Sequence, residues 1–235
     1  MAAVAKTGGF AALLRVFVSS FGVLRTDWQP VVWVMAAITL ILGAVVALAQ
    51  RDIKRMLAYS SINHAGFILL GLQAATARGV EGSLYYLFVY TFMTLGAFAI
   101  VAYVQAGQTQ AETFDDYRAL GRRAPLTALA MTIFMLSLTG VPPLAGFMGK
   151  VYLILAAVHT GMTWLAIIVV INSAISAYYY LRVVVVMYMS DTTERVPLYR
   201  SPFIHTMLTA AAAATFFFGL FADPFMRFAQ GAIGL

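Results

Sequence analysis

The sequence has few charged residues and no cysteine. Only 10% of its 235 residues are charged and 62% are hydrophobic, whereas a typical soluble domain has about 25% and about 45–50%. This composition excludes a water-soluble globular protein of this length. The lack of cysteine excludes a disulfide framework, a thiol nucleophile, a haem-attachment motif and a cysteine-ligated metal site.

The basic residues lie mostly in short clusters between long apolar runs. Fifteen Lys and Arg against nine Asp and Glu give a formal charge of +6, a balance that can also indicate a nucleic-acid or anionic-surface binder. Their position between apolar runs instead predicts a multi-pass membrane protein whose surroundings are the lipid bilayer, with no nucleic-acid partner.

Seven apolar runs approach or exceed the roughly 20 residues that an α-helix needs to cross a bilayer. Runs this long and continuous exclude the alternating strands of a barrel. The sequence therefore predicts an all-α integral membrane protein with about seven transmembrane helices. Their approximate limits are 2–23, 30–49, 56–74, 83–104, 126–158, 162–189 and 203–221.

The distribution of Lys and Arg in the short loops predicts the orientation. The loops after the second, fourth and sixth runs hold eight basic residues, and the opposite side holds three or four. The first side is therefore expected to be cytoplasmic and the C-terminus periplasmic. The eight residues are Arg51, Lys54, Arg55, Arg118, Arg122, Arg123, Arg195 and Arg200.

One connection, 105–125, is longer than the others. Its segment from Thr113 to Pro125 mixes acidic, basic and aromatic residues, which is typical of a brief interfacial helix or loop. We expect no separate domain there.

The fifth run carries the sharpest functional signal. Pro142 and Pro143 lie near its middle and must break the helix, because each removes a backbone donor and clashes with the preceding turn. Broken backbone at membrane depth requires burial in protein or a wet cavity. Lys150 follows about two turns later, and a lysine there is a candidate proton-exchanging group. The alternative is a kinked helix whose lysine extends to the interface.

Lys6 and His64 are the other ionisable residues expected at depth, where each is a functional-site hypothesis. His64 follows Ser60 and Ser61 by three or four residues, so all three share one helix face. An imidazole suits a proton relay, although a structural hydrogen bond to a neighbouring helix explains it equally well.

The sixth run has a weaker polar stripe of Asn172, Ser176 and Tyr179, with Tyr180 beside it and Arg182 further along. The stripe predicts either a wall of a hydrated path or hydrogen bonds between helices.

Other side chains have simpler interpretations. We expect His159 and His205 to lie at helix ends, and Tyr85, Tyr86 and Trp164 to anchor the chain at the membrane interfaces, with Trp28 and Trp33.

Motifs for other chemistries are absent from the sequence. It has no Gly-rich phosphate loop, no HExxH, no GxSxG and no carboxylate pair within a span. We therefore expect no metal site and no cofactor-binding residues in this chain.

Two long motifs resemble a known family. The segment from Arg51 to Gly66, RDIKRMLAYSSINHAG, and the segment from Leu136 to Lys150, LSLTGVPPLAGFMGK, are similar to the antiporter-like membrane subunits of bacterial respiratory complex I. The loop 116–123 and the helix 172–182 most resemble the subunit N branch, in its C-terminal half. The resemblance covers essentially the whole chain.

The resemblance implies a proton-translocating membrane-arm subunit of an NADH-quinone oxidoreductase in the cell inner membrane. Flavin, iron–sulfur clusters and NADH would belong to partner subunits, and the complex would use quinone. In the family, a lysine on a broken helix exchanges protons, and Lys150 occupies its place. Lys6 resembles the lysine that connects two half-channels, and His64 resembles a histidine of the proton relay.

The family pattern also implies a domain arrangement. Family members have about fourteen helices in two inverted repeats, and this chain starts where the eighth helix would, so we expect a fragment or one half of a split subunit. The first helix, 1–25, would end a first repeat. Residues 26–200 would form the second repeat with the broken helix 126–158, and 201–235 a C-terminal transmembrane helix.

Two other functions are compatible with the sequence. The first is a cation/proton antiporter subunit of the multi-subunit sodium/proton type, which shares the proline-broken lysine helix. The second is a structural membrane anchor whose buried polar residues only pack.

Overall fold

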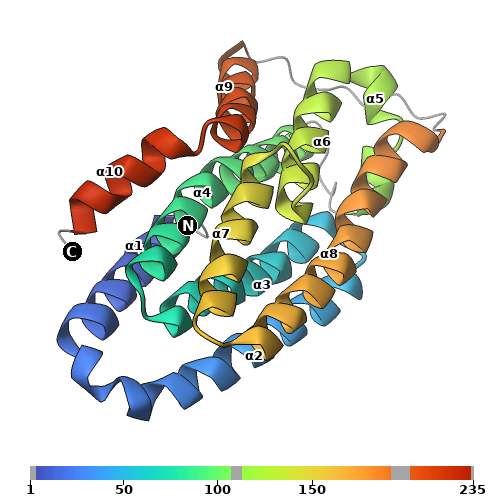
Figure 1. Ribbon diagram of the computed structural model, residues 1–235. Helices are drawn as coiled ribbons and strands as arrows, with labels where there is room; N and C mark the ends of the chain where they lie inside the picture. The colour runs from blue at the N-terminus through green and yellow to red at the C-terminus, as the bar shows by residue number, and fades with distance from the viewer. Residues whose placement is uncertain (1–3, 107–112, 192–201, 234–235) are drawn as a thin grey trace.

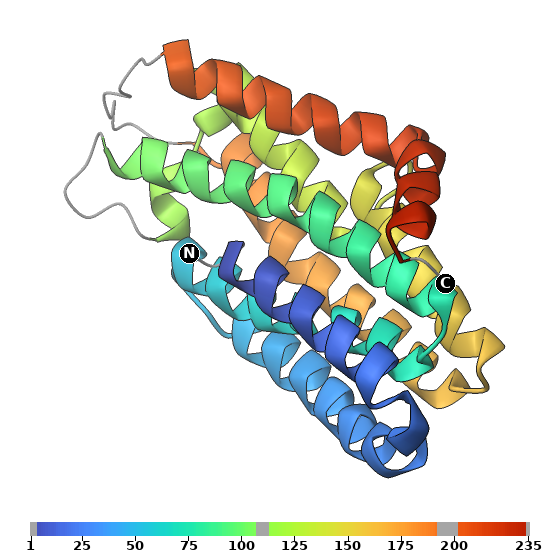
Figure 2. The same cartoon turned by 90° about the vertical axis from the view of Figure 1, so that its left-hand side faces the viewer.

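A computed structural model describes residues 4–106, 113–191 and 202–233, and within them the chain is helical. The bundle is drawn in Figures 1 and 2. In chain order its elements are α1 (Val4–Arg15), the π-helix η1 (Val16–Ser20), the 3₁₀-helix η2 (Gly22–Leu24), α2 (Arg25–Leu48), α3 (Ile53–Ala74), α4 (Ala77–Gln105), the 3₁₀-helix η3 (Phe114–Tyr117), α5 (Leu120–Arg123), α6 (Pro125–Thr139), α7 (Ala145–His159), α8 (Thr163–Met189), α9 (Pro202–Leu220) and α10 (Asp223–Ile233).

Helices α3 and α4 form the centre of the bundle. Helix α4 packs against α1, α3, α6, α7, α9 and α10, while α3 packs against α2, α4, α7 and α8. Figure 2 shows α9, α4, α1 and α2 lying one below another with similar axis directions. Segments far apart in sequence therefore meet around α3 and α4, where a site can be assembled.

The apolar runs of the sequence correspond to helices in the structure, and four helices are long and apolar enough to cross a membrane. These are Gly22–Leu48, Ala77–Gln105, Thr163–Met189 and Phe203–Leu220. Pro125–Thr139 and Ala145–His159 are shorter apolar helices, and α3 has 22 residues. The prediction of an all-helical membrane fold is therefore confirmed for the described residues.

The fifth run is divided at the double proline, as the sequence predicts. Helix α6 ends at Thr139, Gly140 has a φ of +93°, and α7 begins at Ala145. A positive φ is a conformation that glycine adopts without a steric penalty. The amides of Gly140 and Val141 both donate to the carbonyl of Leu136, which closes the C-terminus of α6.

The first run forms a shorter regular helix than the predicted segment 2–23. Helix α1 ends at Arg15 and continues as the π-helix and the 3₁₀-helix. The hydroxyl of Ser19 donates to the carbonyl of Arg15 at this transition. Such a side-chain bond competes with the helical backbone for its acceptor.

Helix α10 is not among the predicted elements, because its 11 residues are too short and too polar to resemble a span. One face of α10 packs on α4. The ring of Phe225 stacks on Phe88 with centroids 4.5 Å apart, and it lies edge-on to Tyr85 at 5.6 Å. The segment 201–235 therefore contains two helices in its described part.

The connection before α6 forms two short helices, as expected for the segment from Thr113 to Pro125. Thr113 and Asp116 form a capping box at η3. The guanidinium of Arg182 lies 4.2 Å from the centroid of the Phe114 ring. Arg182 thus anchors this connection to α8. Residues 107–112 of the longer loop lie outside the described part.

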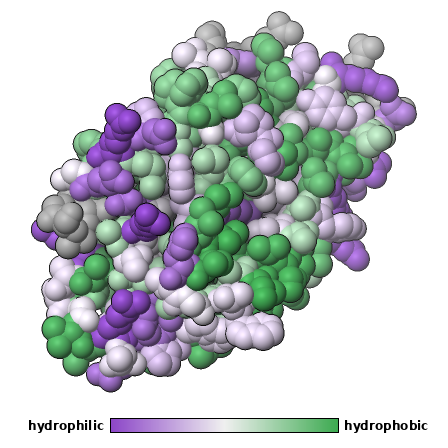
Figure 3. Space-filling view, in the orientation of Figure 1, coloured by the Kyte–Doolittle hydropathy of each residue, from purple (hydrophilic) through white to green (hydrophobic). Residues whose placement is uncertain are grey.

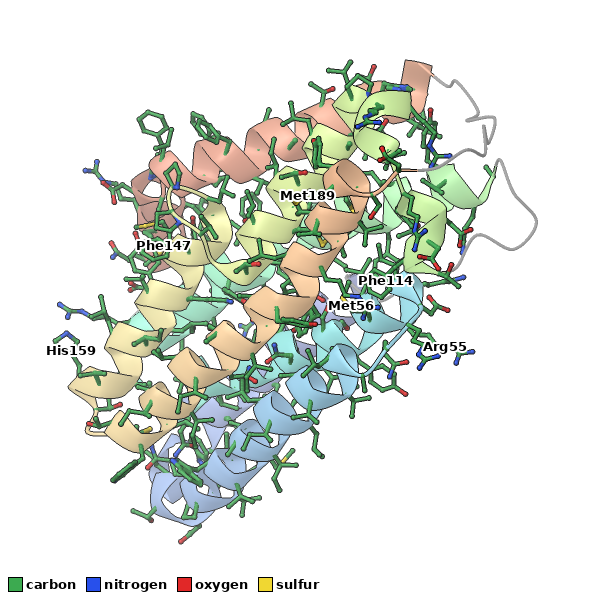
Figure 4. All side chains as sticks on the ribbon, turned by 90° about the vertical axis from the view of Figure 1, so that its right-hand side faces the viewer. Arg55, Met56, Phe114, Phe147, His159 and Met189 are labelled. Atoms are coloured by element: carbon green, nitrogen blue, oxygen red, sulfur yellow. The ribbon has the colours of Figure 1, made fainter. Side chains whose placement is uncertain are left out.

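One face of the molecule is mainly apolar over α8 and α2. In Figure 3 apolar side chains gather there, at the lower right, while hydrophilic ones lie at the upper right, over α5, and along the left side. Figure 4 shows Arg55 and His159 projecting from opposite ends. This pattern suits contact with lipid. The large exposed apolar residues of α2 are Val31, Val34, Met35, Ile38, Ile41, Leu42, Val45 and Leu48.

The close crossing of α6 and α7 generates a stability prediction for Gly146→Ala. A Cβ atom at Gly146 would lie 1.9 Å from the carbonyl oxygen of Ser137, so the two helices must move apart. We expect a loss of about 1–3 kcal/mol, typical of overpacking, measured as a lower thermal unfolding midpoint in detergent. At Gly9 a Cβ meets nothing within 4 Å, and Gly9→Ala should match the unsubstituted protein. Equal unfolding midpoints for both variants would contradict the close contact between α6 and α7 at Gly146.

Candidate proton-transfer site

Lys150 lies inside the bundle beside the break between α6 and α7. Its side chain is buried, with 5% of the residue exposed. The ammonium donates to the carbonyl oxygens of Leu138, at 3.0 Å, and Thr139, at 2.7 Å. These carbonyls belong to the last turn of α6, which has no intrahelical donors and carries the negative end of the helix dipole. The interpretation of Lys150 as extending to the interface is therefore wrong.

A second contact ties the two half-helices together. The amide of Gly146, in the first turn of α7, donates to Ser137 Oγ at 3.0 Å. Ser137 Oγ in turn donates to Met93 Sδ of α4 at 2.8 Å. The break is thus held on both sides: α7 supplies an amide and an ammonium, and α6 supplies oxygen atoms.

His64 lies at the centre of the bundle, 1% exposed, between two tyrosine hydroxyls. Its Nδ1 is 2.6 Å from Tyr86 Oη of α4, and its Nε2 is 2.8 Å from Tyr180 Oη of α8. Both ring nitrogens therefore have hydrogen-bond partners, and α3, α4 and α8 are joined through one imidazole.

The interpretation of Tyr85 and Tyr86 as interfacial anchors is wrong. Both are fully buried. Tyr86 contacts His64, and the hydroxyl of Tyr85 donates to the carbonyl of Phe218 in α9 at 2.6 Å. Trp164, by contrast, is 75% exposed, which suits an anchor. A tyrosine near the end of an apolar run can face a polar core, and only the tertiary arrangement distinguishes the two cases.

The polar stripe of α8 faces α3. The amide of Asn172 donates to Asn63 Oδ1, and Asn63 Nδ2 donates to Tyr179 Oη at 3.2 Å. Tyr179 also hydrogen-bonds with Tyr180, which links the amide pair to His64. The stripe thus forms hydrogen bonds between helices. Asn63 lies next to His64 in sequence, but sequence reasoning gave it no role.

Lys6, on α1, also binds α3. Its half-buried ammonium donates to the carbonyl of Ser61 at 2.7 Å and to the Ser61 hydroxyl. Ser61 lies three residues before His64, nearly one helical turn away. The structure therefore brings Lys6, His64 and Lys150 around one helix.

An aromatic ring, Phe67, lies close to both Lys150 and His64. The ammonium of Lys150 is 4.8 Å from its centroid, and the His64 ring centroid is 5.9 Å away. Phe67 also stacks with Tyr86 at 5.8 Å. The ring face therefore stabilises the charge of Lys150.

The remaining histidines lie outside this site, as the sequence predicts. His159 is the last residue of α7, and His205 lies near the start of α9 against Tyr103, with ring centroids 5.7 Å apart. In the part of the chain that the structure describes, no group of three His, Asp or Glu residues could hold a metal ion.

The chain is similar to the members of a known membrane-protein family. A sequence model for the family described as NADH:quinone oxidoreductase/Mrp antiporter, transmembrane, matches residues 1–176. NADH-quinone oxidoreductase subunit N of Trichlorobacter lovleyi is 46% identical over 237 residues, 100% of this chain and 48% of the relative. The subunit N of Desulforamulus reducens is 43% identical over 97% of this chain and 47% of its own. The chain spans about half the length of these relatives.

Solved structures show the same fold. An archaeal membrane-bound sulfane sulfur reductase matches with a TM-score of 0.87 and 29% identity, over 98% of this chain and 47% of that chain. Respiratory complex I from Thermus thermophilus matches at 0.84 and 25% identity, over 98% and 50%. The Mrp complex of a Dietzia species matches at 0.84 and 19% identity, over 94% and 49%. The last likeness concerns the fold alone.

The contacts of Lys150 predict that Lys150→Met destabilises the chain. The substitution leaves two buried carbonyls of α6 without a donor, a loss of about 1–3 kcal/mol for each unpaired group. We expect a lower thermal unfolding midpoint in detergent. Lys54 is exposed at the start of α3, so Lys54→Met serves as the control and should change little. Identical midpoints for both variants would show that the carbonyl contacts contribute nothing.

Proposed function

The chain belongs to the NADH:quinone oxidoreductase/Mrp antiporter family, and we propose that it translocates protons as part of a membrane-arm subunit N of an NADH-quinone oxidoreductase. The observation that carries the proposal is Lys150 on the broken helix, buried and bound by the carbonyls of Leu138 and Thr139. The identity to subunit N relatives, which runs along nearly the whole of this chain and about half of theirs, supports this assignment over other members of the family.

The geometry around Lys150 suits reversible protonation. The ammonium form is stabilised by the carbonyl dipoles at the α6 C-terminus and by the face of Phe67. No carboxylate holds it in an ion pair among the described residues. A lysine that is stabilised only by dipoles can release its proton without leaving behind an unpaired buried anion.

Lys6 and His64 extend the site from Lys150 into the bundle. Lys6 contacts Ser61, one turn from His64, and His64 contacts two tyrosines. Charging one buried lysine disfavours charging a second nearby. We propose that this repulsion drives the proton between Lys6 and Lys150 through His64.

The energy for translocation would come from partner subunits. This chain has no cysteine, the usual ligand of iron–sulfur clusters, so we assign NADH oxidation, flavin, iron–sulfur clusters and quinone reduction to other subunits of the complex. The partners of this chain would be the other membrane-arm subunits, the lipid bilayer and protons.

The membrane arrangement that fits this role has seven crossings in the cell inner membrane. The broken pair α6 and α7 would together form one crossing, and α1 with η1 another. The basic residues at the Arg55 end (Figure 4) would face the cytoplasm. The C-terminus would then lie on the periplasmic side, and residues 26–200 would correspond to one antiporter-like repeat.

A cation/proton antiporter subunit of the multi-subunit sodium/proton type is the second candidate. The likeness of fold to the Mrp complex favours it, because the same broken lysine helix would serve either complex. Co-purification of the chain with iron–sulfur and flavin subunits supports the oxidoreductase. Co-purification with other transporter subunits alone supports the antiporter.

The proposal predicts the phenotype of Lys150→Ala in the assembled oxidoreductase. We expect proton pumping, followed in inverted vesicles during NADH oxidation, to fall by about tenfold or more, because the exchanging group is lost. The control Lys54→Ala removes a lysine outside the site and should pump normally. Both rates are normalised to the amount of assembled complex.

Unchanged proton pumping in Lys150→Ala would contradict this prediction. Wild-type pumping by Lys150→Ala would overturn the role of Lys150 and favour a structural anchor, in which buried polar residues only pack.

A further inference from the structure

The environment of His64 offers a path for a proton that needs no charge on the ring. Its two nitrogens meet two neutral hydroxyls, of Tyr86 and Tyr180, at 2.6 and 2.8 Å. A neutral imidazole has one donor and one acceptor nitrogen, and a tyrosine hydroxyl can act as either. Therefore one tyrosine donates to the ring while the other accepts from it.

The Tyr180 hydroxyl has a hydrogen-bond partner in either tautomer of His64. When Nε2 donates to Tyr180, the Tyr180 hydroxyl can donate to the oxygen of Ser60. That oxygen is free to accept, because the Ser60 hydroxyl donates its own proton to the carbonyl of Leu57 at 2.8 Å. When Tyr180 instead donates to Nε2, its oxygen can accept from Tyr179. The two tautomers of His64 are thus each compatible with satisfied neighbours on the α8 side.

Tyr86, at the other end of the row, packs against the broken helix through its ring. The ring of Tyr86 packs on Gly149, the residue before Lys150: a Cβ built on Gly149 would lie 2.5 Å from Tyr86 Cδ2. Only glycine permits this approach. Tyr86 consequently bridges the imidazole and the turn of α7 that carries Lys150.

We propose that Tyr86 and Tyr180 are proton-relay residues, which exchange the tautomers of His64 as a proton passes between the α8 side and the Lys150 side. The proposal rests on the proposed function of the chain and adds two residues and a mechanism to it. It requires the row Tyr180, His64 and Tyr86, the alternative partners of Tyr180, and water as the proton donor and acceptor at the two ends of the row.

The transfer is balanced and concerted. A hydronium ion on the α8 side gives a proton to Tyr179, Tyr179 gives its own to Tyr180, and Tyr180 gives its own to Nε2. At the same time Nδ1 gives its proton to Tyr86, and Tyr86 gives its own to a water molecule on the Lys150 side. Each tyrosine oxygen and the ring keep their charge, so no phenolate or imidazolium forms inside the bundle, where an unpaired charge is costly. The reverse transfer, from Tyr86 through the ring to Tyr180, restores the first tautomer.

The chain offers a closely matched control. Tyr85 neighbours Tyr86, is also fully buried, and its hydroxyl donates to the carbonyl of Phe218. Removing that hydroxyl breaks a buried hydrogen bond without touching His64. Tyr117, in η3, is a second control, because its buried hydroxyl has no partner among the described residues. Burial, with Asp116 and Asp52 nearby, raises the pKa of the Tyr117 phenol, which stays neutral.

The test compares Tyr86→Phe, Tyr180→Phe, Tyr85→Phe, Tyr117→Phe and Lys150→Ala in the assembled oxidoreductase. Each tyrosine variant keeps its ring. We expect Tyr86→Phe and Tyr180→Phe to lower proton pumping per assembled complex by tenfold or more, while Tyr85→Phe and Tyr117→Phe pump normally. Residual pumping in the two relay variants should show a larger solvent deuterium effect than that of the unsubstituted enzyme, which a packing defect would not produce.

The outcomes separate the two proposals. Normal pumping by Tyr86→Phe and Tyr180→Phe, with pumping lost in Lys150→Ala, overturns the tyrosine relay alone. An equal loss in Tyr85→Phe also overturns it, since the effect would then be structural. Normal pumping in Lys150→Ala overturns the proposed function itself.

Discussion

The structure depends on the hydrogen bonds between the ammonium of Lys150, which donates, and the carbonyls at the end of α6, which accept. A helix that stops inside the membrane exposes carbonyls that no water can reach, and a buried lysine needs acceptors. Leu138 and Thr139 meet that need within hydrogen-bonding distance. Gly146 approaches Ser137 closely at the same break, and the ring of Phe67 lies beside the ammonium. Without the hydrogen bonds of Lys150, neither the break nor the buried charge would be stable.

The polar interior is connected through α3. Ser61 binds Lys6 of α1, Asn63 binds side chains of α8, His64 binds α4 and α8, and Phe67 contacts the lysine of α7. Each contact joins α3 to another helix through hydroxyls, amides or dipoles, so polar atoms at depth are paired mostly with neutral partners. Such an interior can change its proton arrangement without large changes in charge, which suits transport through an apolar medium.

Local chemistry made part of this site predictable. The double proline specifies a break whatever surrounds it, and a lysine within two turns of that break is conspicuous in a chain with three lysines. Tyr86 was misassigned because a tyrosine near the end of an apolar run is typical of an interfacial anchor, and only the packing of α3 on α4 directs it to His64. Helix α10 was missed because a short polar tail resembles a loop until Phe225 packs on α4. Residues that act through neighbouring helices leave no periodic signal in their own.

The packing of segment 60–67 of α3 also restricts how this sequence can vary. Its side chains point all round the helix, and Ile62, at 41% exposed, is its large apolar residue on the outer surface. One inserted residue would rotate all later side chains of α3 by about 100° about the helix axis. Asn63 and His64 would then no longer point at their present partners. A substitution changes one contact, which a second substitution on the neighbouring helix can restore. A change of helical register changes all of these contacts at once. The spacing of residues in this segment is therefore under a stricter constraint than their identities.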